Sequence, residues 1–305
     1  MNNAARFASG TLKIACRSES HRATQTVWQN APMPKLTVKD LLQLKGKRQL
    51  TEVFVDTPLE ARACESAGID MIVTSELKDV KAIRAAAPNT FLTIGLIYGR
   101  QANSDEAVRG GFKALELGAD AVYFGGSIAS VEKMANEGIP VVGHVGLIPY
   151  KATWTGGFKA VGKTANDALK VYQRTLAYQE AGAIAVEMEV VPQQIASEIS
   201  RRVQIVVLSM GSGTGCDGQY LFVNDILGTN AGHVPRHAKV YRNLKAEYDR
   251  LQLESIAALS EFKAEVETGV YPASEHMVTA KNDEYQKFLK ALETMPEQIV
   301  IKEFL

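Results

Sequence analysis

Three segments of the chain share one junction, in which a helical pattern ends at a glycine and a short apolar run follows. They read ESAGIDMIV, LELGADAVYF and QEAGAIAVEM. Glycine adopts the left-handed conformation that commonly ends helices, so each junction indicates a helix that leads directly into a strand. The recurrence of this unit predicts a fold in which helices and strands alternate.

Short runs rich in Val and Ile alternate with helical patterns from about residue 36 onward. The expected strands lie at residues 52–55, 71–74, 91–94, 121–124, 141–143, 184–190, 205–208 and 220–223. The expected helices lie at residues 59–67, 80–86, 105–117, 127–136, 165–180 and 192–200. This alternation predicts an α/β fold in which parallel strands close into a (β/α)8 TIM barrel. The alternative is an open doubly wound sheet, which a glycine-rich phosphate loop after the first strand would favour; the sequence has none there.

The length and the change of pattern near the C-terminus suggest how the chain is organised. We expect residues 1–35 to be a poorly ordered N-terminal extension and residues 36–305 to form a single barrel domain with C-terminal helices, because α/β barrels reach this length as one domain. After Gly232 the pattern becomes helical and charged over residues 240–268 and again over 283–293. We interpret these segments as helices that pack on the outside of the barrel or on a neighbouring subunit.

Composition narrows the class of partner. The formal net charge is zero, whereas nucleic acid or an anionic membrane would call for a basic surface. No apolar run reaches the ~18 residues that a membrane span needs. The three cysteines are scattered and form no Cys-x-x-Cys motif, so we expect a reducing compartment, the cytoplasm. The basic, Ser- and Thr-containing N-terminal segment leaves an organelle transit peptide as the alternative.

Two glutamates in one expected strand are the first candidates for chemistry. Glu187 and Glu189 lie two residues apart, so both side chains point to the same face of the strand. Carboxylates buried under helices would be costly to ionise, so we expect both to face the barrel lumen near its mouth. There they would serve as a general base or share a cation, the alternative being a salt bridge at the rim. His144 directly follows another expected strand and is either catalytic or a structural hydrogen-bonding residue.

Other polar groups follow the expected strands, where barrel enzymes bind their substrates. A glycine-rich loop, SMGSGTGCDG, can bring backbone N–H groups close to a carboxylate or phosphate. The loop WTGGFK carries a lysine that is either an anion contact or simply exposed to solvent. The substrate-binding candidates are Ser75, Tyr123, Ser209, Gly211, Ser212 and Lys159.

Five stretches carry a resemblance to a known family, in the same order along the chain. They read PVVGHVGLIPYKATWTGGFKAVGK, VEMEVVP, GSGTGCDGQYLFVNDILG, AGHVPRHAK and VETGVYPASEH. They are similar to stretches of ketopantoate hydroxymethyltransferases, over roughly residues 36–276. The resemblance implies a barrel of the phosphoenolpyruvate mutase/isocitrate lyase type and a homo-oligomer. It also implies transfer of a hydroxymethyl group from 5,10-methylenetetrahydrofolate to 2-oxoisovalerate, with Mg2+ stabilising the enolate.

The motifs assign roles to two residues. Glu189 matches the glutamate that removes the α-proton in the family, and His144 matches the histidine of its GHLGL motif. Glu187, in contrast, stands where the family has an apolar residue. It is a new carboxylate near the expected site, so it is either a new acid or base or part of a rebuilt metal position.

The positions of the metal ligands depart from the family. One aspartate becomes Glu76, a second falls on Gly95, and a glutamate falls on Gly125, while the family's lysine becomes Tyr123. Mg2+ needs oxygen ligands in near-octahedral order, so Glu76 alone would hold it weakly. Use of Mg2+ therefore stays open.

The sequence leaves three functions to be weighed. We expect a divergent family member that acts on a small 2-oxo acid or related carboxylate by enolate-type C–C bond chemistry, with hydroxymethyl transfer to 2-oxoisovalerate if the family activity is kept. The alternatives are a metal-independent C–C lyase or other carboxylate enzyme, and a non-catalytic homologue that binds a metabolite.

Overall fold

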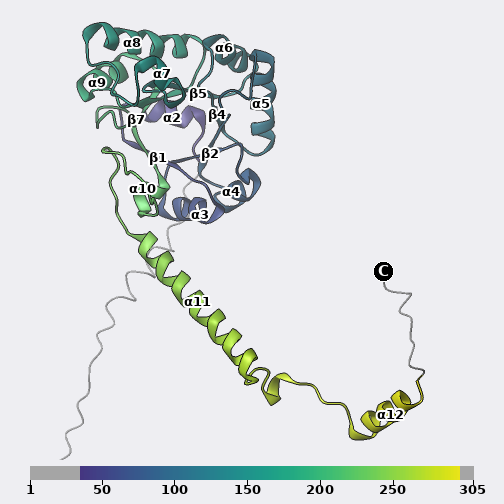
Figure 1. Ribbon diagram of the computed structural model, residues 1–305. Coiled ribbons are helices and arrows are strands. Elements are labelled where there is room, and N and C mark those ends of the chain that lie inside the picture. Colours follow the sequence, from purple (N-terminus) through teal and green to yellow (C-terminus); the bar gives the residue numbers. More distant parts are fainter. Residues whose placement is uncertain (1–34, 296–305) are drawn as a thin grey trace, which may run out of the picture. The chain divides into compact units, whose positions relative to one another are not determined.

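A computed structural model describes residues 35–295, and its strands form a closed barrel (Figure 1). Eight parallel strands pair in chain order, and the last closes onto the first. They are β1 (Leu50–Phe54), β2 (Met71–Ser75), β3 (Phe91–Gly95), β4 (Ala121–Tyr123), β5 (Val141–Gly146), β6 (Ala185–Glu189), β7 (Val206–Met210) and β8 (Gly218–Phe222). The predicted (β/α)8 barrel is therefore confirmed. The expected N-terminal extension lies outside the described residues, apart from Lys35.

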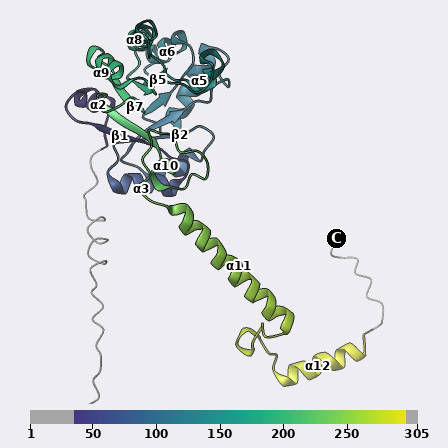
Figure 2. The same cartoon turned by 60° about the vertical axis from the view of Figure 1, so that its left-hand side comes forward.

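Helices surround the strands, as Figures 1 and 2 show. They are α3 (Pro58–Ala67), α4 (Val80–Ala86), α5 (Ser104–Glu116), α6 (Ile128–Asn136), α8 (Ala165–Glu180), α9 (Gln193–Arg202) and the short α10 (Val223–Leu227). A short turn, η1 (Pro149–Lys151), and α7 (Ala152–Thr155) follow β5 at the mouth of the barrel. The expected helices agree with these to within one or two residues at most ends.

Helix α3 shows how the sequence sets these boundaries. The Thr57 hydroxyl accepts a hydrogen bond from the backbone N–H of Glu60, whose carboxylate accepts from the N–H of Thr57 in return. This capping box, with Pro58 in the first turn, starts the helix. The helix ends at Gly68, which has a φ of 73° and leads into β2. The glycine junction read from the sequence therefore has the predicted conformation.

One end of the lumen is apolar and closed. Helix α2 (Val38–Leu44) places Leu41, which is 1% exposed, against Leu50, Met71 and Phe91 at the amino ends of the strands. Burying a leucine side chain contributes about 1.5–3 kcal/mol to stability. Because this end is filled, the opposite end of the lumen, at the carboxyl ends of the strands, is the open one.

The described C-terminal segment forms a separate unit. Within residues 35–295, the chain divides after Asn243 into two compact units, and the second contains α11 (Leu244–Thr268), η2 (Ser274–His276) and α12 (Asn282–Glu293). Both helices were expected, and neither contains a buried residue. Their packing on the barrel or on another subunit stays a prediction. Within residues 35–295, no helix is long and apolar enough to cross a membrane.

Candidate active site

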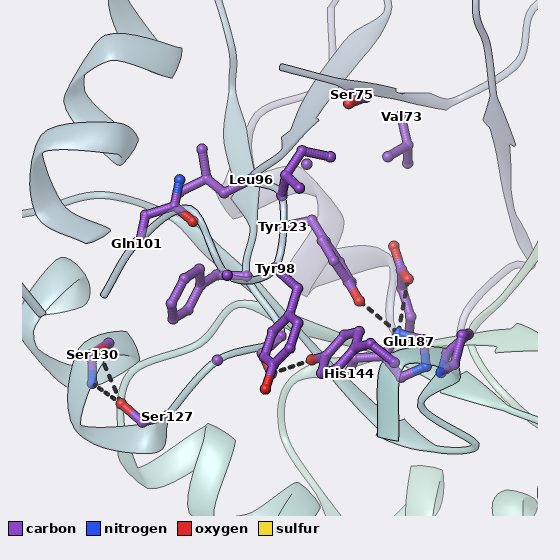
Figure 3. Close-up of a pocket in the computed structure, with 18 of the residues that line it drawn as sticks. Val73, Ser75, Leu96, Tyr98, Gln101, Tyr123, Ser127, Ser130, His144 and Glu187 are labelled. Carbon is purple, nitrogen blue, oxygen red and sulfur yellow. Dashed lines mark hydrogen bonds and ion pairs between the residues drawn. The ribbon is translucent and has the colours of Figure 1, made fainter. Parts of the chain in front are cut away.

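A cavity of about 790 Å³ opens at the carboxyl ends of the strands (Figure 3). Aromatic side chains make up much of its wall, including Phe54, Tyr98, Phe124 and Tyr150. Several residues singled out from the sequence also line it: Ser75, Gly95, Tyr123, Gly125, His144, Glu187 and Glu189. The cavity therefore lies where barrel enzymes carry out their chemistry.

His144 lies at the centre of a hydrogen-bonded group. Its Nδ1 is 3.0 Å from the Tyr123 hydroxyl and 3.3 Å from Oε2 of Glu187. Its Nε2 is 3.2 Å from Oε2 of Glu189 and 2.8 Å from the carbonyl oxygen of Leu147. A carbonyl oxygen only accepts, so Nε2 carries a hydrogen. Figure 3 shows Tyr123 and Glu187 both reaching His144.

The two glutamates make His144 a cation at neutral pH. Burial alone would lower the pKa of His144, but its hydrogen bonds to Glu187 and Glu189 outweigh burial and raise the pKa from 6.5 to about 9. Burial raises the pKa of Glu187, and the hydrogen bond with His144 offsets part of that effect. The result is an imidazolium held between two carboxylates in the wall of the cavity.

Tyr123 is a neutral hydrogen-bond donor in this arrangement. Burial, followed by the charge of Glu187, raises the pKa of the Tyr123 hydroxyl well above its usual value. When His144 is protonated, its Nδ1–H donates toward the Tyr123 oxygen and Glu187. The Tyr123 O–H is then left to donate to a group in the cavity.

The backbone around Glu189 is tightly constrained. Gly146 of β5 lies opposite Glu189 in the strand register, and a Cβ at Gly146 would come within 2.3 Å of the Glu189 carbonyl oxygen. The next residue, Val190, has a φ of 50°. For a β-branched side chain this conformation costs about 1–2 kcal/mol. Such strain clusters at functional sites, where the rest of the structure holds it in place.

Comparison with known proteins identifies the family. A model described as ketopantoate hydroxymethyltransferase matches residues 71–274. The 3-methyl-2-oxobutanoate hydroxymethyltransferase of Thermotoga neapolitana is 31% identical over 271 residues, covering 81% of this chain and 98% of the relative. Its counterpart from Thermus thermophilus is 35% identical over 264 residues, covering 79% of this chain and 98% of the relative.

The chain belongs to the ketopantoate hydroxymethyltransferase family. The resemblance read from the motifs is thereby confirmed, and the expectation of a transferase is supported. A solved 2,3-dimethylmalate lyase, described as a member of the PEP mutase/isocitrate lyase superfamily, is 13% identical with a TM-score of 0.46. That match covers 84% of this chain and 99% of the other. The strand pairing itself establishes the closed barrel.

The glycine-rich loop of this family member uses its side chains within the fold. Ser209 alternates with Leu208 and Met210 of β7 and accepts a hydrogen bond from the N–H of Ser212. The Ser212 hydroxyl donates to the Met188 carbonyl and accepts from the N–H of Val191. These bonds join the loop to the end of β6. Met210 lines the cavity, whereas the predicted substrate-binding residues Ser209, Gly211 and Ser212 do not.

Two further predicted residues lie away from the cavity. Gly211 has a φ of 72°, and a Cβ there would come within 2.8 Å of the His237 ring. Lys159 is exposed and is not among the residues that line the cavity. The substrate-binding roles predicted for the glycine-rich loop and for Lys159 stay predictions that this geometry does not support.

The residues at the family's metal positions do not fit Mg2+. Glu76 is outside the cavity wall, and its Oε1 accepts a hydrogen bond from the N–H of Ile97. Gly125 offers no side chain, and the Tyr150 hydroxyl lies 2.1 Å from where a Cβ of residue 125 would be. Tyr150 also donates to the Gly125 carbonyl, so it occupies the space of the family's glutamate. Within residues 35–295, no group of three or more His, Cys, Asp or Glu side chains could hold a metal ion.

Sequence reasoning missed a buried carboxyl group in the barrel lumen. Glu52 of β1 is 1% exposed, and neither of its carboxyl oxygens has a hydrogen-bond partner. Leu50 and Phe54, on the same face of the strand, point into the lumen with it. The alternation that placed Glu187 and Glu189 in the lumen would also have placed Glu52 there, had its strand been read from Leu50.

Proposed function

We propose that the protein catalyses C–C bond chemistry at the carbon next to the keto group of a small 2-oxo acid, through an enolate, with Glu189 as the base. The observation that carries the proposal is the group formed by Tyr123, His144, Glu187 and Glu189 in the cavity wall. Its specific form is hydroxymethyl transfer to 2-oxoisovalerate, the reaction that the names of the relatives describe. The cytoplasmic location and the homo-oligomer inferred from the sequence stay part of the proposal.

Glu189 is suited to remove a proton from the substrate. Its Oε2 is held by Nε2 of His144, so its other oxygen is available to a molecule in the cavity. The carboxylate takes the proton on the carbon next to the keto group. The C–H electrons move toward the carbonyl, whose oxygen becomes the enolate oxygen.

The Tyr123 O–H donates to the charge that develops on that oxygen, and the positive charge of His144 lies next to this donor. The Tyr123 O–H lies beside protonated His144, and both are oriented by buried partners before the substrate arrives. Donors that are fixed in place and screened from water stabilise a developing oxyanion strongly. No step in this scheme depends on a metal ion, because the residues present do not fit Mg2+.

The size of the cavity suits a second reactant. Cavities of about 300–1,000 Å³ accommodate drug-sized ligands, and this one, at about 790 Å³, is larger than a five-carbon acid needs. The enolate carbon would attack a one-carbon unit, which 5,10-methylenetetrahydrofolate carries in the family's reaction. The new C–C bond joins that unit to the carbon next to the keto group. The two bonds from the one-carbon unit to the folate nitrogens break, and water supplies the hydroxyl group. The proton taken from the substrate and the remaining proton of water go to the two nitrogens, and tetrahydrofolate leaves.

The test is exchange of the α-proton of 2-oxoisovalerate in deuterated buffer, followed by proton NMR. One sample is treated with a chelator and a second receives Mg2+. We expect exchange in both. In Glu189→Gln, shown by circular dichroism to be folded at the assay temperature, we expect the exchange rate to fall by about 10²–10⁴-fold, the contribution typical of a general base.

Each of the other possible outcomes would contradict a different part of the proposed function. Exchange that requires added Mg2+ would contradict the role given to Tyr123 and His144. Ligand-dependent melting without exchange would contradict the proposed enzyme and indicate a metabolite-binding homologue. Exchange without product, when methylenetetrahydrofolate is supplied, would leave enolate chemistry intact and exclude hydroxymethyl transfer.

A further inference from the structure

Four buried polar atoms without a hydrogen-bond partner lie in the barrel lumen. They are both carboxyl oxygens of Glu52, Oε1 of Glu187 and the hydroxyl oxygen of Thr93. Buried polar groups in proteins are nearly always hydrogen-bonded, so an orphan group needs an explanation. None of these atoms has a structural partner, and Glu52 and Thr93 do not line the cavity.

The strand registers place these atoms in adjacent layers. Strands of such a barrel are staggered by about one residue from each to the next, so alternate strands fill one layer of the lumen. Glu52 of β1 and Thr93 of β3 then share a layer, and Glu187 of β6 lies in the next layer toward the cavity. Tyr220, which pairs with Glu52 in the register of β1 and β8, lies in that upper layer too.

An ionised Glu52 would be costly in this place. Its charge would be buried without a single donor, close to the negative charge of Glu187. A buried, unpaired charge costs several kcal/mol and is normally avoided by a change of protonation. In agreement, burial, and after it the charge of Glu187, raises the pKa of Glu52 well above its usual value.

A proton on the Glu52 carboxyl group would give two of these unpaired atoms a hydrogen-bond partner. A neutral Glu52 has an O–H to donate, and Oε1 of Glu187 is an acceptor without a partner. Oε2 of Glu187 already lies at Nδ1 of His144. We propose that Glu52 is a neutral carboxylic acid that donates a hydrogen bond to Oε1 of Glu187, and that it thereby keeps Glu187 ionised and His144 protonated.

Glu52 is a positioning residue in this account, because it acts on the cavity only through Glu187. A donor to a carboxylate stabilises its charged form, and the charged form holds the proton on His144. The titratable groups that face Glu52 and its partner across the lumen are Tyr123, His144, Glu187, Glu189 and Tyr220. Both tyrosines have raised pKa values and stay neutral. The net charge of this buried group therefore depends on the three glutamates and the histidine.

Two substitutions distinguish the effect of the donated hydrogen bond from the effect of the size of the Glu52 side chain. Glu52→Gln keeps the size, the neutrality and an N–H donor, whereas Glu52→Met keeps the approximate size and removes the donor. Glu132→Gln, at an exposed position on α6, is the matched control for the chemical change. Infrared spectroscopy of the whole protein at pH 7 should show the C=O stretch of a protonated carboxyl, lost in Glu52→Gln and kept in Glu132→Gln.

Histidine NMR gives the second readout, with His144 assigned by its loss in His144→Gln. We expect Glu52→Gln to leave the pKa of His144 unchanged and Glu52→Met to lower it by about one unit, a tenfold change in proton affinity. The proposal would be overturned if the infrared spectrum of the wild type lacked the protonated-carboxyl band. A fall in the pKa of His144 in Glu52→Gln would overturn it as well, because it would mean that the wild type carries a charge there.

The effect on catalysis rests on the proposed function, and the spectroscopy does not. We expect the pH profile of α-proton exchange to be kept in Glu52→Gln and displaced to lower pH in Glu52→Met. If the wild type shows no exchange, the proposed function fails, while the infrared and NMR results still decide the protonation of Glu52. If Glu52→Met does not fold, Glu52→Gln and the wild-type spectrum decide it alone.

Discussion

The two sides of the cavity differ in the kind of side chain that they supply. Strands β2, β3 and β4 end there in Ser75, Gly95 and Tyr123, which carry no charge, whereas β5 and β6 contribute a histidine between two glutamates. The resemblance to the family implies metal ligands on the first side, and the structure has none that fit there. The electrostatics of this site therefore depend on one side, where charges of both signs are paired.

Replacing His144 removes the cation from the charged side of the cavity. This substitution is the most direct test of the difference between the two sides. His144→Gln leaves two buried carboxylates without their common partner, which costs about 3–5 kcal/mol of stability. We expect a large fall in melting temperature at pH 7 and a smaller one at acidic pH, where protonation neutralises the carboxylates. Thermal unfolding followed by circular dichroism measures both.

The same residue predicts how wild-type stability varies with pH. The folded pKa of His144, about 9, is above its ordinary value of 6.5. A raised pKa stabilises the folded state fully below the ordinary value, and the stabilisation is lost as pH rises toward 9. The wild-type melting temperature should approach that of His144→Gln across this range. A constant difference would contradict the charged state of His144.

Tyr123→Phe tests whether the uncharged side takes part in the chemistry. Loss of one donor to a developing oxyanion costs about 10²–10³-fold in kcat. We expect a loss of this size in α-proton exchange, with little change in the KM for 2-oxoisovalerate. Tyr172→Phe, a partly buried tyrosine on α8, is the matched control and should keep full activity. An active Tyr123→Phe would mean that the charged side works alone.

Two glycines on the uncharged side should respond differently to an added methyl group. A Cβ at Gly95 would meet its nearest neighbour at 3.5 Å, whereas a Cβ at Gly125 would clash with the Tyr150 hydroxyl. We expect Gly125→Ala to cost about 1–3 kcal/mol, as overpacking does, and Gly95→Ala to be nearly neutral. Urea denaturation of the two variants measures the difference. Equal stabilities would mean that Tyr150 moves freely.

The smallest effect is expected at Lys159. It is exposed, and surface substitutions away from special features usually change stability by no more than about 0.5 kcal/mol. We expect Lys159→Ala to keep both its melting temperature and its KM for 2-oxoisovalerate. A rise in KM would show that the loop after β5 closes over the substrate, and would restore the role predicted from the sequence.

Local patterns predicted the barrel and part of the site. Apolar runs and glycine junctions gave the strands, and alternation gave the lumen-facing side chains of Glu187 and Glu189. The same alternation shows why Ser209 turns away from the lumen between Leu208 and Met210. Glu52 went unnoticed because it was taken as the start of its strand.

Contacts between distant segments could not be predicted in this way. Tyr150 lies 25 residues from Gly125 along the chain, and nothing near either residue indicates that they meet. The same holds for His144, whose raised pKa depends on a second strand that lies more than forty positions further along the sequence.

The conformation of Val190 has a consequence for anyone who evolves this protein in the laboratory. A glycine there would relieve about 1–2 kcal/mol of backbone strain, at a cost in chain entropy of about 0.5–1 kcal/mol. Selection for heat resistance alone would therefore accept Val190→Gly, while the neighbouring Glu189 would lose the stiff turn that aims it. Libraries screened without an activity assay would drift toward robust but slow variants at this position, an instance of the trade-off between stability and activity.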